Sequence, residues 1–193
     1  MARMGAELRR QDFVEATIKV IAEHGVSDAT TRRIAAAAGS PLASLHYVFH
    51  TKDDLFYAVY ETLFSQLQLA LDDVPTGATA AESAADMLRQ LITWFSSHPD
   101  LARAQSELFF WTLRNNRELA TKIYTMAMEA TEQAMERAVG TQLDKTRLIT
   151  ATRLLVQLAD GLLIAWPAHG DLERLKAETE TACLALKLLV ENI

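Results

Sequence analysis

The chain has 193 residues, half of them are hydrophobic, and the formal net charge at pH 7 is −6. Such a chain is long enough to bury one large core or two small ones, which indicates a soluble globular protein. The first 60 residues carry equal numbers of basic and acidic side chains, so the later residues carry the whole negative charge. This distribution is compatible with DNA being met by one end only, and equally with an ordinary solvated surface.

Transmembrane, secreted and disulfide-linked classes find no support in the sequence. It contains no uninterrupted run of roughly 18 apolar residues, and the start MARMGAELRRQD lacks the apolar stretch of a secretory signal. We therefore expect the protein in the cytoplasm and without membrane contact. Cys183 is the single cysteine and has no flanking histidine in TACLALKLLV, so we expect it to be a small buried hydrophobic residue.

Helix-forming residues dominate, and no β-branched run alternates with the period of a strand, so we predict an all-α fold. The first helix carries apolar residues at helical spacing and stops at Gly25. Thr30 or Thr31 is expected to cap a second helix, which runs through Ala38 and ends at Gly39. A third helix is predicted from about Leu42 to near residue 50.

The remaining helices follow from their caps and breaks. Thr51, with Asp54 three residues later, predicts the start of a long helix that reaches about residue 73. Pro75 and Gly77 interrupt the pattern in DDVPTGATAAE, residues 72–82. Further helices are predicted over residues 78–97, 100–115, 117–139, 144–166 and 171–191. The sequence thus predicts about nine helices, with one domain at residues 1–51 and a second at residues 52–193.

Two short helices joined by a tight turn that contains glycine are typical of a helix-turn-helix, whose second helix enters the major groove of DNA. Helical hairpins that bind no DNA share this pattern. The residues expected to face inward are Ile34, Ala35, Ala38, Leu45 and Phe49. This leaves Ser40, Ala43, Ser44, His46, Tyr47 and His50 to face outward.

Residues 13–61 read FVEATIKVIAEHGVSDATTRRIAAAAGSPLASLHYVFHTKDDLFYAVYE and resemble the N-terminal domain of the TetR family of transcriptional repressors. The segments AEHG, TT-R-IA-AG, L-Y-F and K-DL stand in order at the family's spacing. The resemblance covers about a quarter of the chain, and the remainder is similar in the number and length of its helices. It implies three DNA-binding helices followed by six helices for ligand binding and dimerisation.

Carried over to this chain, the resemblance implies that Thr31 and Arg32 meet phosphates and that Lys52 binds a phosphate at the start of the fourth helix. Hydroxyls, helix N-termini and basic side chains suit phosphate oxygens, which supports these roles independently. The residues implied to lie along the groove are Ser40, Ala43, Ser44 and Tyr47, with His46 and His50 beside them. The threonines can instead only cap a helix, and Tyr47 can pack its ring.

This chain departs from the usual family pattern at three positions. Leu42 stands where a lysine is frequent, His46 where a tyrosine is frequent, and Val48 where another aromatic residue is frequent. These changes bear on base preference and on some backbone contacts. Without a basic side chain at Leu42, the phosphate contribution and its salt dependence should be weaker.

Metal and enzyme classes are not favoured. His46 and His50 stand four residues apart, a spacing that can hold a metal, but no third histidine or cysteine lies near them in the sequence. We expect no metal and no cofactor. The motifs of serine hydrolases, P-loop proteins and zinc proteases do not occur, so catalysis is not expected. The alternative function is an all-α small-molecule-binding protein or enzyme whose helix-turn-helix does not read DNA.

A ligand-responsive regulator needs an input site, and aromatic and methionine side chains crowd residues 78–139. We therefore expect a bulky, mainly apolar effector there, with Gln105, Tyr124 and Asp160 as polar anchors. The predicted ligand-binding residues are Phe64, Trp94, Phe95, Gln105, Phe109, Trp111, Tyr124, Met128 and Asp160. The same side chains can also be plain core. A charged Asp160 would favour a cationic or donating ligand, or it would pair across a dimer.

The last two helices carry apolar residues at alternating steps of four and three. Two such helices from each of two chains predict a four-helix bundle across a two-fold axis, with buried core helices of a monomer as the alternative. The predicted interface residues are Leu155, Leu162, Trp166, Ala182, Leu186 and Leu189. The sequence therefore predicts a homodimeric repressor that binds an inverted-repeat operator and is released by a small apolar molecule, through the long helix that begins at Lys52.

Overall fold

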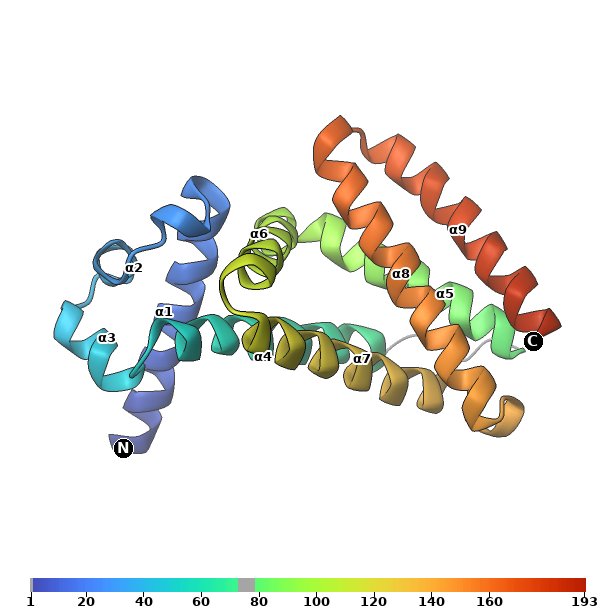
Figure 1. The fold of residues 1–193 in the computed structure, drawn as a ribbon, viewed down its shortest axis with the longest axis horizontal. Coiled ribbons are helices and arrows are strands. Elements are labelled where there is room, and N and C mark those ends of the chain that lie inside the picture. The colour runs from blue at the N-terminus through green and yellow to red at the C-terminus, as the bar shows by residue number, and fades with distance from the viewer. Residues whose placement is uncertain (1, 73–78) are drawn as a thin grey trace. The chain divides into compact units, whose positions relative to one another are not determined.

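The structure is a computed structural model that describes residues 2–72 and 79–193. Within these ranges the chain is all-α, as the composition predicts, with nine α-helices and two short 3-10 turns. The helices in chain order are α1 (Ala2–His24), α2 (Thr31–Ala37), α3 (Leu42–Val48), α4 (Lys52–Asp72), α5 (Ala80–Ser97), α6 (Pro99–Asn115), α7 (Arg117–Val139), α8 (Lys145–His169) and α9 (Leu172–Asn192) (Figure 1). The predicted break at Pro75 and Gly77 lies outside the described residues.

Side-chain caps mark several of the helix starts. Thr30 accepts a hydrogen bond from the backbone N–H of Arg33, which identifies Thr30 as the residue that caps α2. Thr79 and Glu82 form a reciprocal capping box at the start of α5. Asp144 and Asp171 accept backbone N–H groups at the starts of α8 and α9. Each cap satisfies N–H groups that the first helical turn leaves without a partner.

Two predicted helix limits differ from the structure at prolines. The helix predicted from residue 100 begins one residue earlier, at Pro99, where the missing N–H costs nothing. α8 was predicted to stop at Trp166, but it continues through Pro167 to His169. Proline removes one hydrogen bond of the ladder, and the helix closes with a bond from the Gly170 N–H to the Trp166 carbonyl at 2.8 Å.

The described chain divides into two compact units, which differ from the predicted domains. Unit 1 contains Met1–Leu63 and Pro99–Ile123, and unit 2 contains Phe64–His98 and Tyr124–Ile193. These units group helices that pack together, whereas the predicted boundary between residues 51 and 52 divides the chain by function and stays a prediction. α6 packs along α1, and this long-range contact joins α6 and the start of α4 to the N-terminal helices. The division falls within α4 and within α7.

The core of unit 1 is built on the inward faces of α1, α2, α3 and α4. Phe13, Ile34 and Leu55 are fully buried, and Leu45 and Phe49 are nearly so. Of the residues predicted to face inward, only Ala38 remains partly exposed. The Thr17 hydroxyl donates to the Phe13 carbonyl at 2.7 Å, which satisfies it within the apolar core. Short helices are stable here because their apolar faces are buried.

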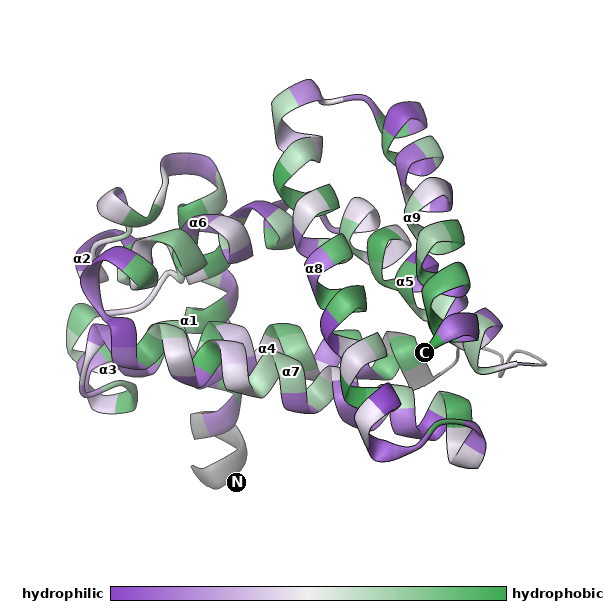
Figure 2. Cartoon of the chain, turned by 45° about the vertical axis from the view of Figure 1, so that its right-hand side comes forward, coloured by the Kyte–Doolittle hydropathy of each residue, from purple (hydrophilic) through white to green (hydrophobic). Residues whose placement is uncertain are grey.

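The core of unit 2 is formed where α5 packs against α8 and α9. Leu88 of α5, Leu155 of α8 and Leu186 of α9 have no exposed surface. Figure 2 shows apolar residues alternating with polar ones along α8 and α9, as expected for helices that bury one face. Cys183 is buried, as predicted, and its thiol donates to the Ala85 carbonyl at 3.3 Å. Burial raises the pKa of this thiol to about 11.

This packing bears on the predicted dimer interface, which stays a prediction. Leu155, Leu162, Ala182 and Leu186 are buried inside the single chain, so they offer little surface to a second copy. Trp166 and Leu189 are partly exposed. The pattern of fours and threes marks the face that packs within the subunit, because a core helix and an interface helix share that periodicity. The exposed large apolar residues on these helices are Ile164, Leu172, Leu184 and Leu188.

α8 is long and apolar enough to cross a membrane by length and composition alone, and no other helix in the described residues is. α8 has this length and composition without an uninterrupted apolar run, which is why the sequence did not predict a membrane span. Its buried residues Leu148, Leu155 and Leu162 recur at seven-residue intervals. We interpret α8 as a core helix of unit 2, because it packs against α5 and α9.

Candidate nucleic-acid interface

The turn between α2 and α3 sets how the two short helices meet. Gly39 has φ +59°, in the left-handed region that side chains with a Cβ rarely adopt. Its N–H donates to the Ala36 carbonyl, and the next N–H, of Ser40, donates to the Ala35 carbonyl, both at 3.0 Å. These bonds end α2 and reverse the chain, so that Pro41 can precede α3. The result is a helix-turn-helix.

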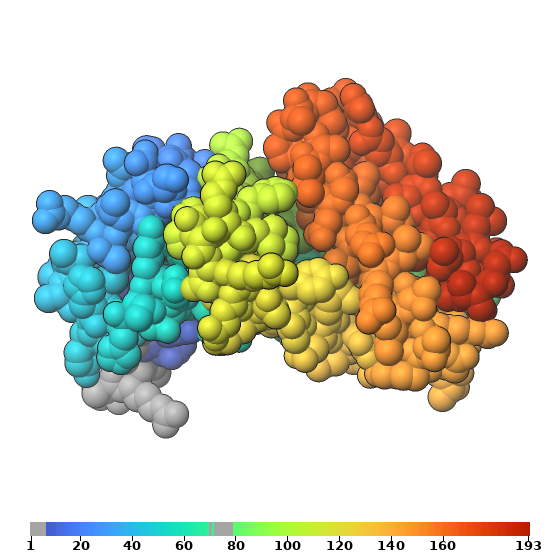
Figure 3. Space-filling view, viewed as in Figure 1, coloured from blue at the N-terminus to red at the C-terminus, as the bar shows by residue number. Residues whose placement is uncertain are grey.

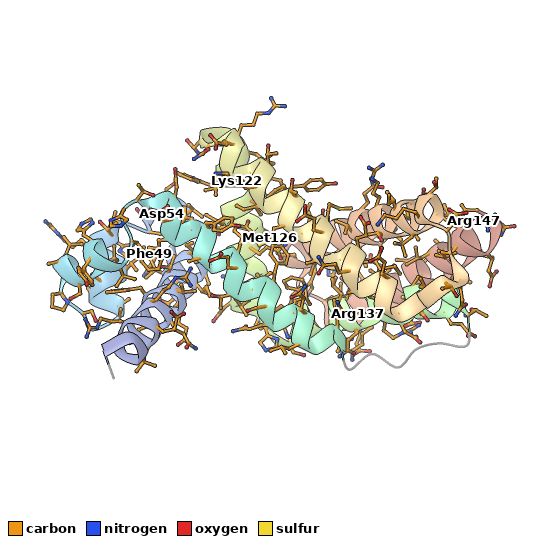
Figure 4. All side chains as sticks on the ribbon, turned by 90° about the horizontal axis from the view of Figure 1, so that it is seen from below. Phe49, Asp54, Lys122, Met126, Arg137 and Arg147 are labelled. Carbon is orange, nitrogen blue, oxygen red and sulfur yellow. The ribbon has the colours of Figure 1, made fainter. Side chains whose placement is uncertain are left out.

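α3 presents one face to the protein and the other to solvent. Leu45 and Phe49 are buried, and the guanidinium carbon of Arg10 lies 5.7 Å from the centre of the Phe49 ring. Tyr47 is 80% exposed, far more than a packed tyrosine, and His46 is exposed beside it. Figure 4 labels Phe49 at the inner side of this helix pair. The exposed ring of Tyr47 rules out the interpretation that it packs in the core.

All predicted DNA-binding residues of unit 1 are at least partly accessible. Arg32, Ala43, His46, Tyr47 and His50 are exposed, and Thr31, Ser40, Ser44 and Lys52 are partly exposed. In Figure 3 the side chains of α2 and α3, coloured blue to cyan, lie on the molecular surface. Arg33 is exposed and pairs loosely with Asp28 at 3.8 Å. This surface carries cations, hydroxyls and an aromatic ring, which are groups that bind phosphates and base edges.

The start of α4 adds a cation next to this surface. Thr51 and Asp54 cap each other's backbone N–H groups at 2.9 and 3.0 Å, as the sequence predicts. Lys52 follows directly, at the N-terminus of α4, where the helix dipole attracts anions. Its ammonium nitrogen lies 4.9 Å from the centre of the Phe56 ring and 5.6 Å from that of Trp111. Burial lowers the pKa of Lys52, and the charge of Asp53 partly opposes that shift.

α6 supports the helix-turn-helix through polar contacts that the sequence did not reveal. The Glu107 carboxylate accepts the backbone N–H of Val26 at 3.2 Å, and Arg103 donates to the Ala22 carbonyl at 3.2 Å. Gly25, with φ +78°, lies against the same carboxylate, because an added Cβ would meet it at 3.1 Å. These residues are about 80 positions from their partners, so sequence spacing carries no signal of the contact.

The corner between α6 and α7 holds the first turn of α4. Asn116 donates from its side-chain nitrogen to the Asp53 carboxylate at 2.7 Å, and its side-chain oxygen accepts the Leu119 N–H that opens α7. The Tyr60 hydroxyl donates to the Gln105 carbonyl at 2.9 Å. Asn116 at the corner and Gln105 on α6 therefore both hold the first turns of α4.

The predicted ligand-binding residues do not form one cluster within either unit. Gln105, Phe109 and Trp111 belong to unit 1, and the other six belong to unit 2. Trp94 and Phe95 meet edge to face at 5.0 Å, and Phe95 is buried. Trp111 packs on Phe56 with ring centres 5.3 Å apart. It lines a groove of about 390 Å³ together with His24, Glu107, Phe110 and Arg114, none of which was predicted to bind ligand.

The three predicted polar anchors differ in their surroundings. The side-chain oxygen of Gln105 is buried and has no hydrogen-bond partner in the described residues. Tyr124 is 45% exposed. Asp160 is also exposed, yet the apolar side chains around it remove enough water to raise its pKa. Of the three, Gln105 has the geometry expected of an anchor, because a buried acceptor without a donor is costly.

No group of three His, Cys, Asp or Glu side chains that could hold a metal occurs in the described residues. His46 and His50 are exposed on α3 and just beyond it. Both lie on the outward face of the helix-turn-helix, which is the face expected to contact DNA.

The fold and this surface define a helix-turn-helix DNA-binding protein with a larger all-α part. Comparison with known proteins gives its family. The model for bacterial regulatory proteins of the TetR family matches residues 13–59. The chain is 28% identical, over 174 residues, to the HTH-type nicotine-responsive transcriptional repressor HdnoR of Paenarthrobacter nicotinovorans, covering 85% of this chain and 89% of that protein. The relatives that it matches are regulators rather than enzymes.

Solved structures share the fold over nearly the whole chain. FadR from Bacillus subtilis, a transcriptional regulator solved with stearoyl-CoA, is 19% identical with a TM-score of 0.71, covering 95% of this chain and 98% of that one. The multidrug binding protein EbrR, solved with malachite green, is 22% identical with a TM-score of 0.68, covering 94% of this chain and 97% of that one. Residues 13–59 thus give the chain a DNA-binding domain of the TetR family, and its relatives in sequence are transcriptional regulators.

Proposed function

We propose that this regulator is a repressor that binds an inverted-repeat operator as a homodimer and leaves it when a small, mainly apolar molecule binds. The exposed face of α3 is the observation that carries the DNA-binding part. Tyr47, with most of its ring in solvent, is suited to contact bases or sugars, and Arg32 and Lys52 are suited to contact phosphates. Ser40, Ala43, Ser44, His46 and His50 complete the proposed contact surface.

The proposed effector is an aromatic or otherwise bulky molecule with a hydrogen-bond donor. The unpaired side-chain oxygen of Gln105 favours a ligand that donates, such as an amine or an alcohol. HdnoR is named as nicotine-responsive, and EbrR was solved with malachite green and with proflavin, which are aromatic cations. FadR was solved with stearoyl-CoA, so an acylated ligand is the competing class. Because Asp160 is exposed, we do not propose it as a charged anchor for the ligand.

The proposed dimer uses the outward faces of α8 and α9 in place of the buried residues predicted from sequence. Ile164 on α8 and Leu184 and Leu188 on α9 are each more than half exposed in the single chain. Gly161 and Asp160 lie on the exposed part of α8 near Ile164 in sequence. Exposed leucines on one helix face are costly in water and are stabilised when a second copy covers them.

A regulator of this kind acts in the cytoplasm, where its operator is, and has no catalytic role. Catalysis would need a nucleophile or an acid–base pair with a shifted pKa in a cleft. Among the thiol and carboxyl groups of the described residues, those with a raised pKa are Cys183, a buried thiol, and Asp160, an exposed carboxylate. Neither is paired with a second reactive group in the described residues.

The test begins with selection of a binding sequence from a pool of random duplexes by the purified protein. We expect an inverted repeat, and we expect Tyr47→Ala to weaken binding to it far more than binding to an unselected duplex. The matched control is His98→Ala, which removes an exposed ring from unit 2, away from the proposed contact surface in unit 1. It should leave both affinities unchanged. Proflavin, an amine-bearing analogue of proflavin, and stearate are then added to the complex in separate titrations. We expect the two ligands that donate hydrogen bonds to release the DNA. No selected sequence at all would contradict the proposal.

A further inference from the structure

We propose that Trp111 is a positioning residue for DNA binding: its indole ring holds the Lys52 ammonium at the N-terminus of α4, ready for a phosphate. This inference rests on the proposed function, in which Lys52 contacts the DNA backbone. It assigns a DNA-binding role to a residue of α6 that the sequence placed in the ligand site. The observation behind it is the pair of ring contacts made by Lys52.

The three side chains form a small stack, which we call the lysine stack: Lys52, Phe56 and Trp111. Phe56 is one helical turn after Lys52 on α4 and is fully buried, so its ring is fixed by the core. Trp111 meets that ring edge to face, with an interplanar angle of 85°. The Lys52 ammonium lies within 6 Å of both ring centres, the range in which a cation is attracted to an aromatic face.

The ammonium in this stack makes no ion pair at contact distance with the residues that the structure describes. In the described part of the chain its interactions are with the two rings and with the charge of Asp53, whose carboxylate is hydrogen-bonded to Asn116. Aromatic rings attract the charge but accept hydrogen bonds poorly, so the N–H groups of Lys52 still favour an oxygen partner. A DNA phosphate that approaches the start of α4 would supply that oxygen, assisted by the helix dipole.

The stack also orders a side chain that would otherwise be flexible. Lysine has four rotatable bonds, and fixing them when DNA binds costs conformational entropy. Lys52 is already partly buried against Phe56 and Trp111 in the free protein, so less of that entropy remains to be lost on binding. Phe56 is needed for the core, whereas Trp111 is only partly buried and lines a groove. Trp111 is therefore the member of the stack that can be changed to test this role.

The experiment uses fluorescence anisotropy with a labelled duplex of random sequence, titrated over a series of salt concentrations. A phosphate contact made by one lysine contributes about 0.9 to the slope of log affinity against log salt. Lys52→Ala should remove most of that contribution and weaken binding on the order of tenfold at low salt. Trp111→Leu, which keeps an apolar group, should lose a large part of the same slope, and Trp111→Phe should retain most of it.

Two comparisons separate positioning from a general structural effect. Phe110→Leu changes the adjacent ring on α6, which is 51% exposed, and should leave the salt slope unchanged. The double variant Lys52→Ala with Trp111→Leu should bind no more weakly than Lys52→Ala alone, because both changes remove one contact. Thermal melting of each variant checks that the folded fraction is the same.

The outcomes distinguish this inference from the proposed function. If Lys52→Ala leaves the salt slope unchanged, the phosphate role of Lys52 is wrong, and this inference fails with it. If Lys52→Ala lowers the slope and Trp111→Leu does not, only the positioning role of Trp111 is refuted. Tighter DNA binding by Trp111→Leu would also overturn the inference, because it would mean that the indole withholds Lys52 from phosphate.

Discussion

Unit 1 and unit 2 hold their helices together by different means. In unit 1, Arg103 and Glu107 of α6 bind α1 and the turn after it, and Asn116, between α6 and α7, binds α4. In unit 2, α5, α8 and α9 meet through apolar side chains, with one charged cluster in which Arg89 binds Glu180 and Asp86. The comparison teaches that both units have an apolar core and that unit 1 adds hydrogen bonds between segments far apart in the chain, which fix how those segments meet.

The apolar core of unit 2 should show the largest effect of a single substitution. Leu186→Ala removes a side chain with no exposed surface and leaves a cavity, so we expect a loss of about 2–5 kcal/mol in the free energy of unfolding. Denaturant unfolding followed by circular dichroism measures it. The control is Leu69→Ala on α4, where the side chain is 70% exposed and the expected change is below about 0.5 kcal/mol. Equal losses at the two positions would contradict the assignment of the core.

The outward apolar face of unit 2 should control association and not folding. Replacing Leu184 and Leu188 by glutamate together places two carboxylates in the proposed interface, which should weaken dimerisation by several kcal/mol, roughly the cost of burying unpaired charges. Sedimentation equilibrium measures the dimer, and circular dichroism should show unchanged helix content. Leu69→Glu, outside this face, should remain dimeric. A double variant that dimerises as well as the original chain would refute this face as the interface.

The polar contacts of unit 1 should show a smaller effect. Glu107→Ala removes the acceptor for the Val26 N–H, which is partly buried, so we expect a loss of about 1 kcal/mol. DNA affinity should fall as well, because the turn that precedes α2 loses its support. Glu107→Gln keeps an acceptor oxygen and should retain most of the stability and affinity. Thermal melting and the random-duplex titration measure the two effects, and no difference between alanine and glutamine would show that the hydrogen bond contributes nothing.

The pH dependence of Asp160 should be the smallest effect. Burial by neighbouring apolar groups raises its pKa, so the folded chain holds this proton more tightly than the unfolded chain. Its stabilising contribution is present below the unfolded pKa of 3.8 and is lost as the pH rises through the folded pKa. Asp160→Asn should remove this change, which we expect to be on the order of a few tenths of a kcal/mol because solvent screens the exposed carboxylate. The measurement is the difference in melting temperature between the two proteins across this pH range. A constant difference would show that the pKa of Asp160 is not raised.

Helix number, helix starts and the helix-turn-helix could be predicted because they depend on local chemistry. Thr30, Thr51 and Thr79 cap helices through partners three residues away, and Gly39 permits a turn within a few residues. Those signals are present in any short window of the sequence. The exposed face of α3 also follows from local spacing, because Leu45 and Phe49 are one turn apart on the buried side.

Which face of α9 is buried and which is exposed could not be predicted in the same way. Leu186 and Leu184 are both leucines on one helix, and only the packing of α5 and α8 decides that the first is buried and the second exposed. The resemblance covered residues 13–61, so it carried no information about these helices. The ligand site predicted from aromatic residues near one another in sequence stays a prediction, and Trp111 and Trp94 belong to different units.

By itself, the sequence determined the all-α class, the caps, the turn at Gly39 and the residues that α3 exposes, because each depends on side chains within one or two helical turns. Only the tertiary structure decided that α6 joins the N-terminal helices, that Glu107 supports the turn before α2, and that Trp111 lies against Lys52. These contacts join residues far apart in the chain, and their formation depends on how the side-chain surfaces of neighbouring helices fit together. Neither residue type nor periodicity along one helix records which partner fills the space beside it.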